Sequence, residues 1–377
     1  MASERQIYVG GVPVGGGAPV AVQTMTKTET ADLAATMTQI RTVADAGADI
    51  VRVAVPREKD VEALKTIVAD SPIPVIADIH FNYTLALKAL DAGAHCVRLN
   101  PGNIGGPDKV VEVVTAAKRA GIPMRIGANS GSLPRHLERL AEEDQAEALV
   151  EAALEEVRLL EMLDYHDFKI SVKSSHVPTM IRAYRMLSGR VPYPLHLGVT
   201  EAGPPFTGSI KSAVGLGSLL ADGIGDTIRV SLTADPVEEV KVCWEILKSL
   251  NLRERGPVLI ACPSCGRDNV GVQTLAEEVE DRLGTYEEHF EVAVLGCAVN
   301  GPGESGDADF GIAGGRDVGF IYAHGKVLRK VESEQLIDEL FNEIDRWIAD
   351  GMQRPERRKM AKPAALAMAE ASAIPLE

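Results

Sequence analysis

The sequence predicts a (β/α)8 TIM-like barrel followed by a smaller α/β domain. Short β-branched runs alternate with longer segments of helical period from residue 19 to about residue 250. The alternation repeats eight times in about 230 residues, which is close to the usual size of a closed parallel barrel. A charged stretch at residues 251–257, closed by Gly-Pro, then interrupts the pattern and predicts the domain boundary.

The barrel needs eight strands. They are expected at residues 20–24, 50–55, 74–79, 96–100, 124–128, 168–173, 195–199 and 227–232. Between the strands, apolar side chains recur at helical spacing, for example at Leu33, Met37, Ile40 and Val43. Strands that alternate with helices pair in parallel. A doubly wound open sheet is the alternative, because the number of strands does not prove closure.

A glycine and a following arginine recur in four of the units. The pairs are Gly47 and Arg52, Gly93 and Arg98, Gly121 and Arg125, and Gly223 and Arg229. Each glycine fits the end of a helix, where a left-handed residue is favoured. Each arginine falls late in the next strand, so a barrel would gather all four at its carboxyl-terminal end, where such folds keep their active sites.

The first domain is expected at residues 1–250 and the second at 257–350. The second has expected strands at 258–261, 292–295, 310–312, 318–322 and 327–331, and expected helices at 274–283 and 334–348. Residues 351–377 are first basic and then rich in alanine, so this tail is expected to be mobile.

Composition excludes several classes of partner. The 377 residues include 39 Lys and Arg against 54 Asp and Glu, a net charge of −15, and aromatic residues make up 4%. Nucleic acid and anionic membrane surfaces need excess cations, and base stacking needs aromatic side chains. No stretch reaches the length of a membrane span. The charged first residues do not resemble a secretory signal, so a cytoplasmic enzyme acting on a small molecule is expected.

Strand alternation predicts a cluster of cations inside the barrel. It places inward Arg98 with Asn100, Lys169 with Ser171 and Lys173, Arg125 with Asn129, and Arg229 with Ser231, and Arg52 falls late in its own strand. Any one of these arginines could be a solvated charge. Four cations about 8 Å apart, however, repel by roughly 2 kcal/mol per pair at an effective dielectric of about 20. A multiply charged anion would offset this repulsion, and guanidinium groups suit phosphate oxygens, so we expect a small phosphorylated substrate, with diphosphate favoured.

Proton carriers are expected at the same end. His80 and His196 stand at strand ends, where they could transfer protons or bind substrate, although each could equally be a packing residue. Glu201 lies on the loop that follows the seventh strand and is a candidate proton carrier.

Three cysteines in the second domain suggest a metal centre. Cys262 and Cys265 form a Cys-x-x-Cys motif after one strand, and Cys297 follows another strand. Cys96 and Cys243 fit the core better, so Glu304, after a Gly-Pro-Gly turn, is the nearest candidate for a fourth ligand. The cysteine spacing alone fits structural zinc and an iron-sulfur cluster equally, and the oxygen ligand favours iron.

These motifs resemble the bacterial 4-hydroxy-3-methylbut-2-en-1-yl diphosphate synthases. The resemblance rests on residues 97–102, 125–129 and 195–203 in the barrel and on residues 262–265 and 296–304 in the second domain. It covers roughly residues 5–350, and the motifs of both domains agree in order and spacing.

The resemblance implies a reaction: reductive ring opening and dehydration of 2-C-methyl-D-erythritol 2,4-cyclodiphosphate in the non-mevalonate pathway of isoprenoid synthesis. It implies a [4Fe-4S] cluster held by Cys262, Cys265, Cys297 and Glu304, the last an exchangeable ligand. Flavodoxin or ferredoxin would supply electrons, and two chains would form a head-to-tail homodimer. Glu201 would transfer a proton. The diphosphate would be bound by residues Arg52, Arg98, Asn100, Arg125, Asn129, Lys173, Arg229 and Ser231.

Two alternatives remain at this point. The first is a phosphate-binding barrel enzyme, such as a lyase, that carries a structural zinc module. The second is an adaptor whose metal domain binds protein or nucleic acid, which the acidic net charge and the inward cations disfavour.

Overall fold

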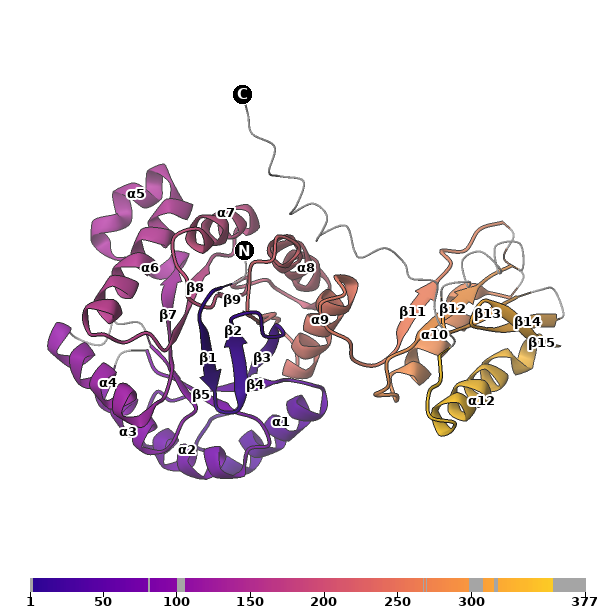
Figure 1. The fold of residues 1–377 in the computed structure, drawn as a ribbon, viewed down its shortest axis with the longest axis horizontal. Coiled ribbons are helices and arrows are strands. Elements are labelled where there is room, and N and C mark those ends of the chain that lie inside the picture. The colour runs from indigo at the N-terminus through magenta and orange to yellow at the C-terminus, as the bar shows by residue number, and fades with distance from the viewer. Residues whose placement is uncertain are drawn as a thin grey trace. The chain divides into compact units, whose positions relative to one another are not determined.

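The computed structural model describes residues 3–80, 82–99, 106–266, 268, 270–297, 308–314 and 318–354. The chain divides into two compact units, Met1–Arg253 and Glu254–Glu377, and each is described by itself (Figure 1). Asn100, Glu304 and most of the basic tail lie outside the described residues.

The first unit is a closed parallel barrel. Its strands are β3 (Ala21–Met25), β4 (Ile50–Ala54), β5 (Val75–Asp78), β6 (Cys96–Arg98), β7 (Met124–Asn129), β8 (Phe168–Lys173), β9 (His196–Leu197) and β10 (Thr227–Ile228). Each strand pairs in parallel with the next, and β10 pairs with β3. A parallel bridge between Ile170 and Leu195 joins β8 to β9 and completes the circle. The predicted barrel is confirmed, and the open sheet is wrong.

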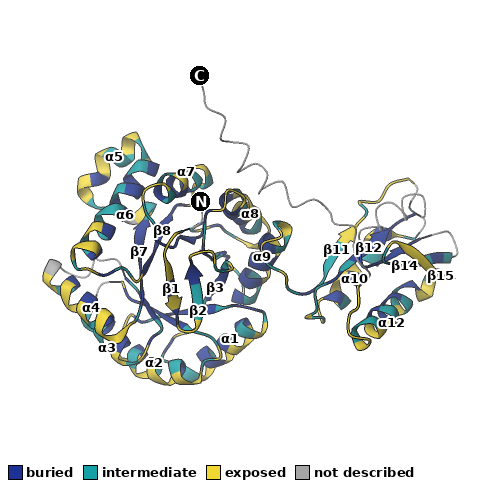
Figure 2. Ribbon diagram, viewed as in Figure 1, coloured by how far each residue is buried: buried dark blue, intermediate teal, exposed yellow. Residues whose placement is uncertain are grey.

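Helices surround the barrel (Figure 1). They are α1 (Leu33–Asp45), α2 (Glu58–Asp70), α3 (Tyr83–Asp91), α4 (Pro107–Ala120), α5 (Glu138–Glu143), α6 (Gln145–Met162), α7 (Val177–Ser188), α8 (Pro205–Ala221) and α9 (Pro236–Ser249). Side chains cap several of them, as Asp32 does when it accepts a hydrogen bond from Ala35 N. Each of the longer helices buries one face against the strands and exposes the other (Figure 2).

A hairpin that the sequence analysis did not predict covers the amino-terminal end of the barrel. Strands β1 (Gln6–Val9) and β2 (Val12–Gly15) pair antiparallel. Their buried side chains pack with the first inward side chains of β3 to β6. This group consists of Ile7, Val9, Val14, Ala21, Ile50, Ile76 and Cys96. The packing is apolar, so the amino-terminal end of the interior is closed by a hydrophobic plug and polar inward side chains lie nearer the carboxyl-terminal end.

The second unit is a five-stranded mixed sheet with two main helices. The strands are β11 (Val258–Ala261), β12 (Glu291–Leu295), β13 (Phe310–Ala313), β14 (Val318–Ala323) and β15 (Lys326–Glu332), and the helices are α10 (Val272–Leu283) and α12 (Leu336–Ala349). The first three strands pair in parallel, and the last two extend the sheet antiparallel. Phe290, Phe310 and Trp347 meet edge to face in its core.

No helix in the described parts of the chain has the length and apolar character needed to cross a membrane.

Candidate functional site

Five of the predicted cations meet inside the barrel, and we call them the cation cluster. They are Arg52, Arg98, Arg125, Lys173 and Arg229. The outward neighbours in the strands, such as Ile126 and Val172, belong to the hydrophobic core, so alternation turns the charged side chains inward as predicted. The five come from β4, β6, β7, β8 and the residues just after β10.

Burial of these like charges is energetically unfavourable. The Arg125 and Lys173 side chains are almost fully buried. Burial, reinforced by the neighbouring arginines, lowers the pKa of Lys173 and of Arg125 well below their usual values. Burial also lowers the pKa of Arg52 to about 10, although Asp78 opposes the shift. The barrel interior therefore holds positive charge that a bound anion would stabilise.

Two buried carboxylates balance part of this charge. Asp78, on β5, lies 3.1 Å from Arg98 Nη1 and 3.5 Å from Arg52 Nε. Arg52 and Arg98 hold the pKa of Asp78 below its ordinary value, against the burial of the group. Glu239, in the first turn of α9, lies 3.4 Å from Arg229 Nη2. The cation cluster thus keeps an excess of positive charge.

Several polar nitrogen atoms in the barrel lack a hydrogen-bond partner within the described structure. They include Arg125 Nη1, Arg229 Nε and His196 Nε2. A buried polar atom without a partner costs about 1–3 kcal/mol. The Nδ1 atom of His196 pairs with Thr227 Oγ1 at 2.7 Å, and burial lowers the pKa of this histidine well below its usual value. Oxygen atoms of a bound anion would satisfy the unpaired arginine donors.

Lys169, which strand alternation places on the inward face with Ser171 and Lys173, belongs to the same interior although it is not assigned to the substrate-binding set. Its side chain is fully buried on β8, and Nζ lies 3.4 Å from Gln23 Oε1. Burial lowers the pKa of Lys169 to about 8. The sequence predicts this inward placement, because Lys169, Ser171 and Lys173 alternate on one face of the strand.

The remaining predicted barrel residues lie near the carboxyl-terminal end. Asn129 ends β7 in register with Lys173, and Ser231 is half-buried beyond β10. Glu201 is exposed and has a φ of +53°, an unusual conformation for a residue other than glycine. His80 follows β5 and is exposed as a residue. Asn100 lies outside the described residues.

The cysteines of the second unit follow neighbouring strands. Cys262 comes after β11 and Cys297 after β12, and Cys262 N donates to Val294 O at 3.0 Å across these two parallel strands. None of the three predicted cysteine ligands forms a disulfide in the described part of the chain, and Cys265 is exposed. No three side chains of His, Cys, Asp or Glu in the described ranges converge as a ready-made metal site. The thiols suit zinc or iron by chemical type, and Glu304 lies outside the described residues.

Asp268, which the sequence analysis did not single out, connects the two cysteine loops. Its carboxylate accepts hydrogen bonds from Ser264 Oγ at 3.1 Å and from Val270 N and Val272 N. These backbone donors, Val270 first, keep the pKa of Asp268 below its ordinary value. A Cβ atom on Gly296 would lie 3.0 Å from Asp268 Oδ1, so this carboxylate lies directly beside the residue that precedes Cys297.

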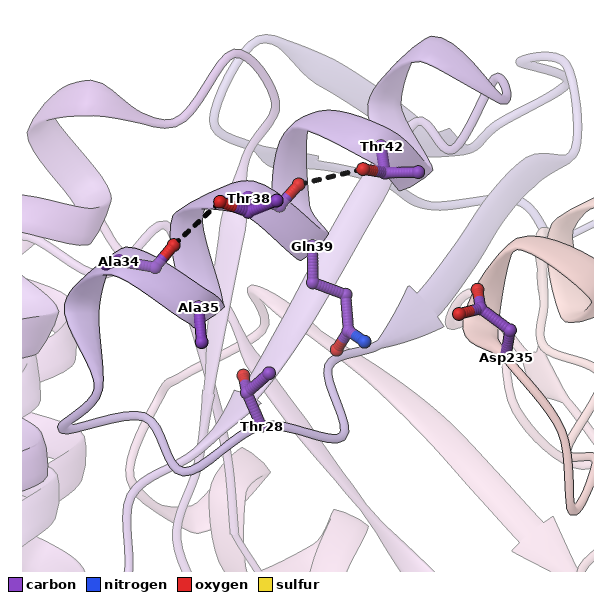
Figure 3. Close-up of a pocket in the computed structure, with 7 residues that line it drawn as sticks. All are labelled: Thr28, Ala34, Ala35, Thr38, Gln39, Thr42 and Asp235. Carbon is purple, nitrogen blue, oxygen red and sulfur yellow. Dashed lines mark hydrogen bonds between the residues drawn. The ribbon is translucent and has the colours of Figure 1, made fainter.

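A hollow on the outer surface is a weaker candidate for a binding site. It is lined by Thr28, Ala34, Ala35, Thr38, Gln39, Thr42 and Asp235 (Figure 3). The hydroxyls of Thr38 and Thr42 donate hydrogen bonds to backbone carbonyl groups of their own helix, α1. The hollow gathers no cluster of charged groups, and the cation cluster of the barrel interior remains the stronger site.

Comparison with known families matches both units. Residues 4–244 match the GcpE TIM-barrel domain, and residues 258–346 match the GcpE protein C-terminal domain. A protein of Geobacter sulfurreducens named 4-hydroxy-3-methylbut-2-en-1-yl diphosphate synthase (flavodoxin) is 55% identical over 93% of this chain and 99% of its own length. The protein of the same name from Clostridium perfringens is 52% identical over 90% of this chain and 98% of its own. Among solved structures, dihydropteroate synthase of Yersinia pestis covers 66% of this chain and 100% of its own, with 13% identity and a TM-score of 0.49.

A half-buried glutamate supports the wall of the barrel beside the cation cluster. Glu156, on α6, accepts a hydrogen bond from Gly127 N at 2.7 Å. Gly127 has a φ of +134°, and a Cβ atom there would lie 1.9 Å from Ser171 O, so only glycine fits. Burial of the carboxyl group raises the pKa of Glu156 to about 8, against the Gly127 N–H.

This acid should make stability depend on pH. An unfolded glutamate loses its proton near pH 4.5, so between that value and about 8 the folded chain binds more protons and its free energy of unfolding falls as pH rises. Glu156→Gln keeps an acceptor for Gly127 and removes the titration. We therefore expect urea unfolding at pH 6, 7 and 8 to show a smaller decline for this variant than for the wild type. The exposed Glu143→Gln is the control, and parallel pH profiles for wild type and Glu156→Gln would contradict the prediction.

Proposed function

The chain belongs to the GcpE family of 4-hydroxy-3-methylbut-2-en-1-yl diphosphate synthases, and on that premise we propose that it converts 2-C-methyl-D-erythritol 2,4-cyclodiphosphate into 4-hydroxy-3-methylbut-2-en-1-yl diphosphate. The single observation that carries the proposal is the buried excess of positive charge in the barrel, where five cations meet two carboxylates. A substrate with two phosphate groups carries charge of the opposite sign to this excess. Its phosphate oxygens can accept hydrogen bonds from several of the cations.

The diphosphate is bound by the cation cluster together with polar side chains at the carboxyl-terminal end. Asn100, Asn129, His196 and Ser231 complete the proposed binding set. Ring opening breaks a carbon–oxygen bond and leaves its electron pair on a phosphate oxygen. Among the described residues, Arg125 and Arg229 each have a buried donor without a partner, so these two can stabilise that developing charge without first breaking a hydrogen bond.

The reaction consumes two electrons and two protons and releases one water molecule. A [4Fe-4S] cluster, bound by Cys262, Cys265, Cys297 and Glu304, would supply the electrons singly, and the carboxylate ligand would be exchangeable. Glu201 is the proposed proton carrier. Its exposed position on the loop after β9 allows it to exchange protons with solvent. The thiol donors and the connection through Asp268 support a shared centre for the two cysteine loops.

We propose flavodoxin as the electron donor, because the names of the similar proteins from Geobacter sulfurreducens and Clostridium perfringens specify flavodoxin, and ferredoxin is the alternative. A cytoplasmic location fits such a partner. Family membership gives no support to the zinc-containing lyase or to the adaptor.

A homodimer is the proposed assembly, and one helix offers an apolar surface for it. Phe206, Ile210 and Val214 recur every four residues on α8 and are 78%, 50% and 54% exposed. The only charged residue of α8 is Lys211, in a chain with a net charge of −15. Two copies of an acidic protein can approach most closely where such charge is absent, so α8 is the proposed contact.

Turnover tests the function directly. The full chain, purified without oxygen, should be brown, should contain iron, and should convert the cyclodiphosphate when a low-potential reductant or reduced flavodoxin is supplied. A colourless protein with stoichiometric zinc and no turnover would reject the proposal.

Substituting Arg98 should weaken substrate binding more than the chemical step. In Arg98→Ala we expect the dissociation constant of the cyclodiphosphate to rise by about tenfold to a hundredfold, the range for losing a charged hydrogen bond. Isothermal titration measures it. Arg119→Ala, an exposed arginine on α4, is the control. An unchanged dissociation constant for Arg98→Ala would remove Arg98 from the binding set.

Substituting Glu304 should separate cluster assembly from catalysis. In Glu304→Ala the three thiolates remain, so we expect iron to be retained while turnover falls by at least about a hundredfold, because the exchangeable ligand is lost. Iron analysis, electron paramagnetic resonance and anaerobic kinetics measure the two effects. Unchanged turnover would contradict the assignment of Glu304 as a ligand.

A charge on the apolar face of α8 should dissociate the homodimer. Ile210→Lys places a cation in the proposed contact and should shift the chain to a monomer in sedimentation velocity. Val111→Lys alters another exposed apolar residue, on α4, and should leave the dimer intact. A wild-type monomer, or a dimer that survives Ile210→Lys, would exclude this surface.

A further inference from the structure

One buried carboxylate outside the predicted set is held by hydrogen bonds and an ion pair at the edge of the cation cluster. Glu239 is 1% exposed and lies in the first turn of α9. Its Oε2 atom accepts from Thr24 Oγ1 at 3.0 Å and from Arg229 Nη2 at 3.4 Å. Its Oε1 atom accepts a hydrogen bond from Leu232 N at 3.1 Å and forms an ion pair with Lys27 Nζ, also at 3.1 Å. Three hydrogen bonds and an ion pair therefore use both oxygens of this carboxylate.

The four donors come from two segments that flank one junction of the barrel. Thr24 belongs to β3 and Lys27 follows it, whereas Arg229 and Leu232 follow β10, and β10 pairs with β3. Lys27 Nζ also donates to Leu232 O at 2.8 Å and to Ala234 O. Glu239 thus links the segment that follows β3 to the segment that follows β10, at the end of the barrel where the cation cluster lies.

Among the residues that contact Glu239, Arg229 has a buried donor with no hydrogen-bond partner in the described structure. Glu239 holds its Nη2 atom, while its Nε atom is buried with no partner in the described part of the chain. A guanidinium is planar, so fixing one nitrogen fixes the direction of the others. Removal of the carboxylate would release Arg229 Nη2 and would leave the Thr24 hydroxyl without this acceptor, whereas Lys27 would keep its backbone acceptors.

We propose that Glu239 is a positioning residue that aims Arg229 at the diphosphate group of the substrate. The inference rests on the proposed function and adds a residue that acts through Arg229 without touching the substrate. Two effects of Glu239 have opposite signs. Its negative charge by itself weakens the binding of an anion nearby, whereas its hold on Arg229 strengthens that binding.

The sign of the change in pyrophosphate affinity therefore tests the proposal. We titrate inorganic pyrophosphate into the full chain and compare wild type with Glu239→Gln, a neutral side chain of the same shape. We expect the dissociation constant to rise about tenfold, the loss of roughly one charged hydrogen bond. Equal or tighter binding would show that the charge alone matters and would overturn the proposal. Glu238→Gln, the exposed neighbour that pairs with Lys241, is the matched control and should not weaken binding.

A double-mutant cycle excludes a general structural effect. Once Arg229→Ala has removed the aimed group, adding Glu239→Gln should weaken pyrophosphate binding no further. An equal loss in both backgrounds would overturn the proposal. Thermal unfolding checks that each variant folds. If Glu239→Gln does not fold, Glu239→Asp serves instead, because it keeps the charge and withdraws the carboxylate by one methylene, and it should also weaken binding.

The experiment separates this proposal from the proposed reaction. A wild-type chain that does not bind pyrophosphate would overturn both. Wild-type binding that Glu239→Gln leaves intact would overturn only the role of Glu239. Binding that depends on Glu239, in a protein that does not turn over the cyclodiphosphate, would retain the positioning role and reject the reaction.

Discussion

The structure depends on the enclosure of like charges inside a closed sheet. Five cations from different strands meet in the barrel, and the pKa values of Arg125 and Lys173 fall well below normal because burial removes the water that would stabilise their charge. The surrounding hydrophobic core must hold these groups against their repulsion. These buried charges lower the free energy of unfolding, but they are already in place to bind a ligand. Such preorganisation is common in sites that bind highly charged ligands.

Two carboxylates divide the task of holding the cations. Asp78 pairs with Arg98 and Arg52 on one part of the barrel, and Glu239 pairs with Arg229 across the junction of β10 and β3. Both acids accept from cations without neutralising the cluster. In the part of the chain that the structure describes, donors such as Arg125 Nη1 remain unpaired, and an anion bound there would supply the missing acceptors.

Much of this site could be predicted because it follows from local periodicity. In β8 an alternating strand must turn Lys169, Ser171 and Lys173 to one face, and eight repeats close into a barrel that has only one interior. Glu239 could not be found this way. It stands on a helix beside the equally acidic Glu238, and nothing in the sequence distinguishes the buried member of the pair from the exposed one. Glu156 could not be predicted either, because its partner is a backbone N–H group of a strand that is distant in the sequence.

The sequence by itself determined the order of strands and helices, the inward placement of the arginines and the cysteine motifs, because these depend on neighbours a few residues apart. It also carried the family motifs at their spacing. Only the tertiary structure decided that the hairpin β1–β2 plugs the barrel, which acid pairs with which cation, and which donors remain unpaired. Burial, pairing and pKa shifts arise from groups that meet only when distant segments pack together, and contact between distant segments has no periodicity along the chain.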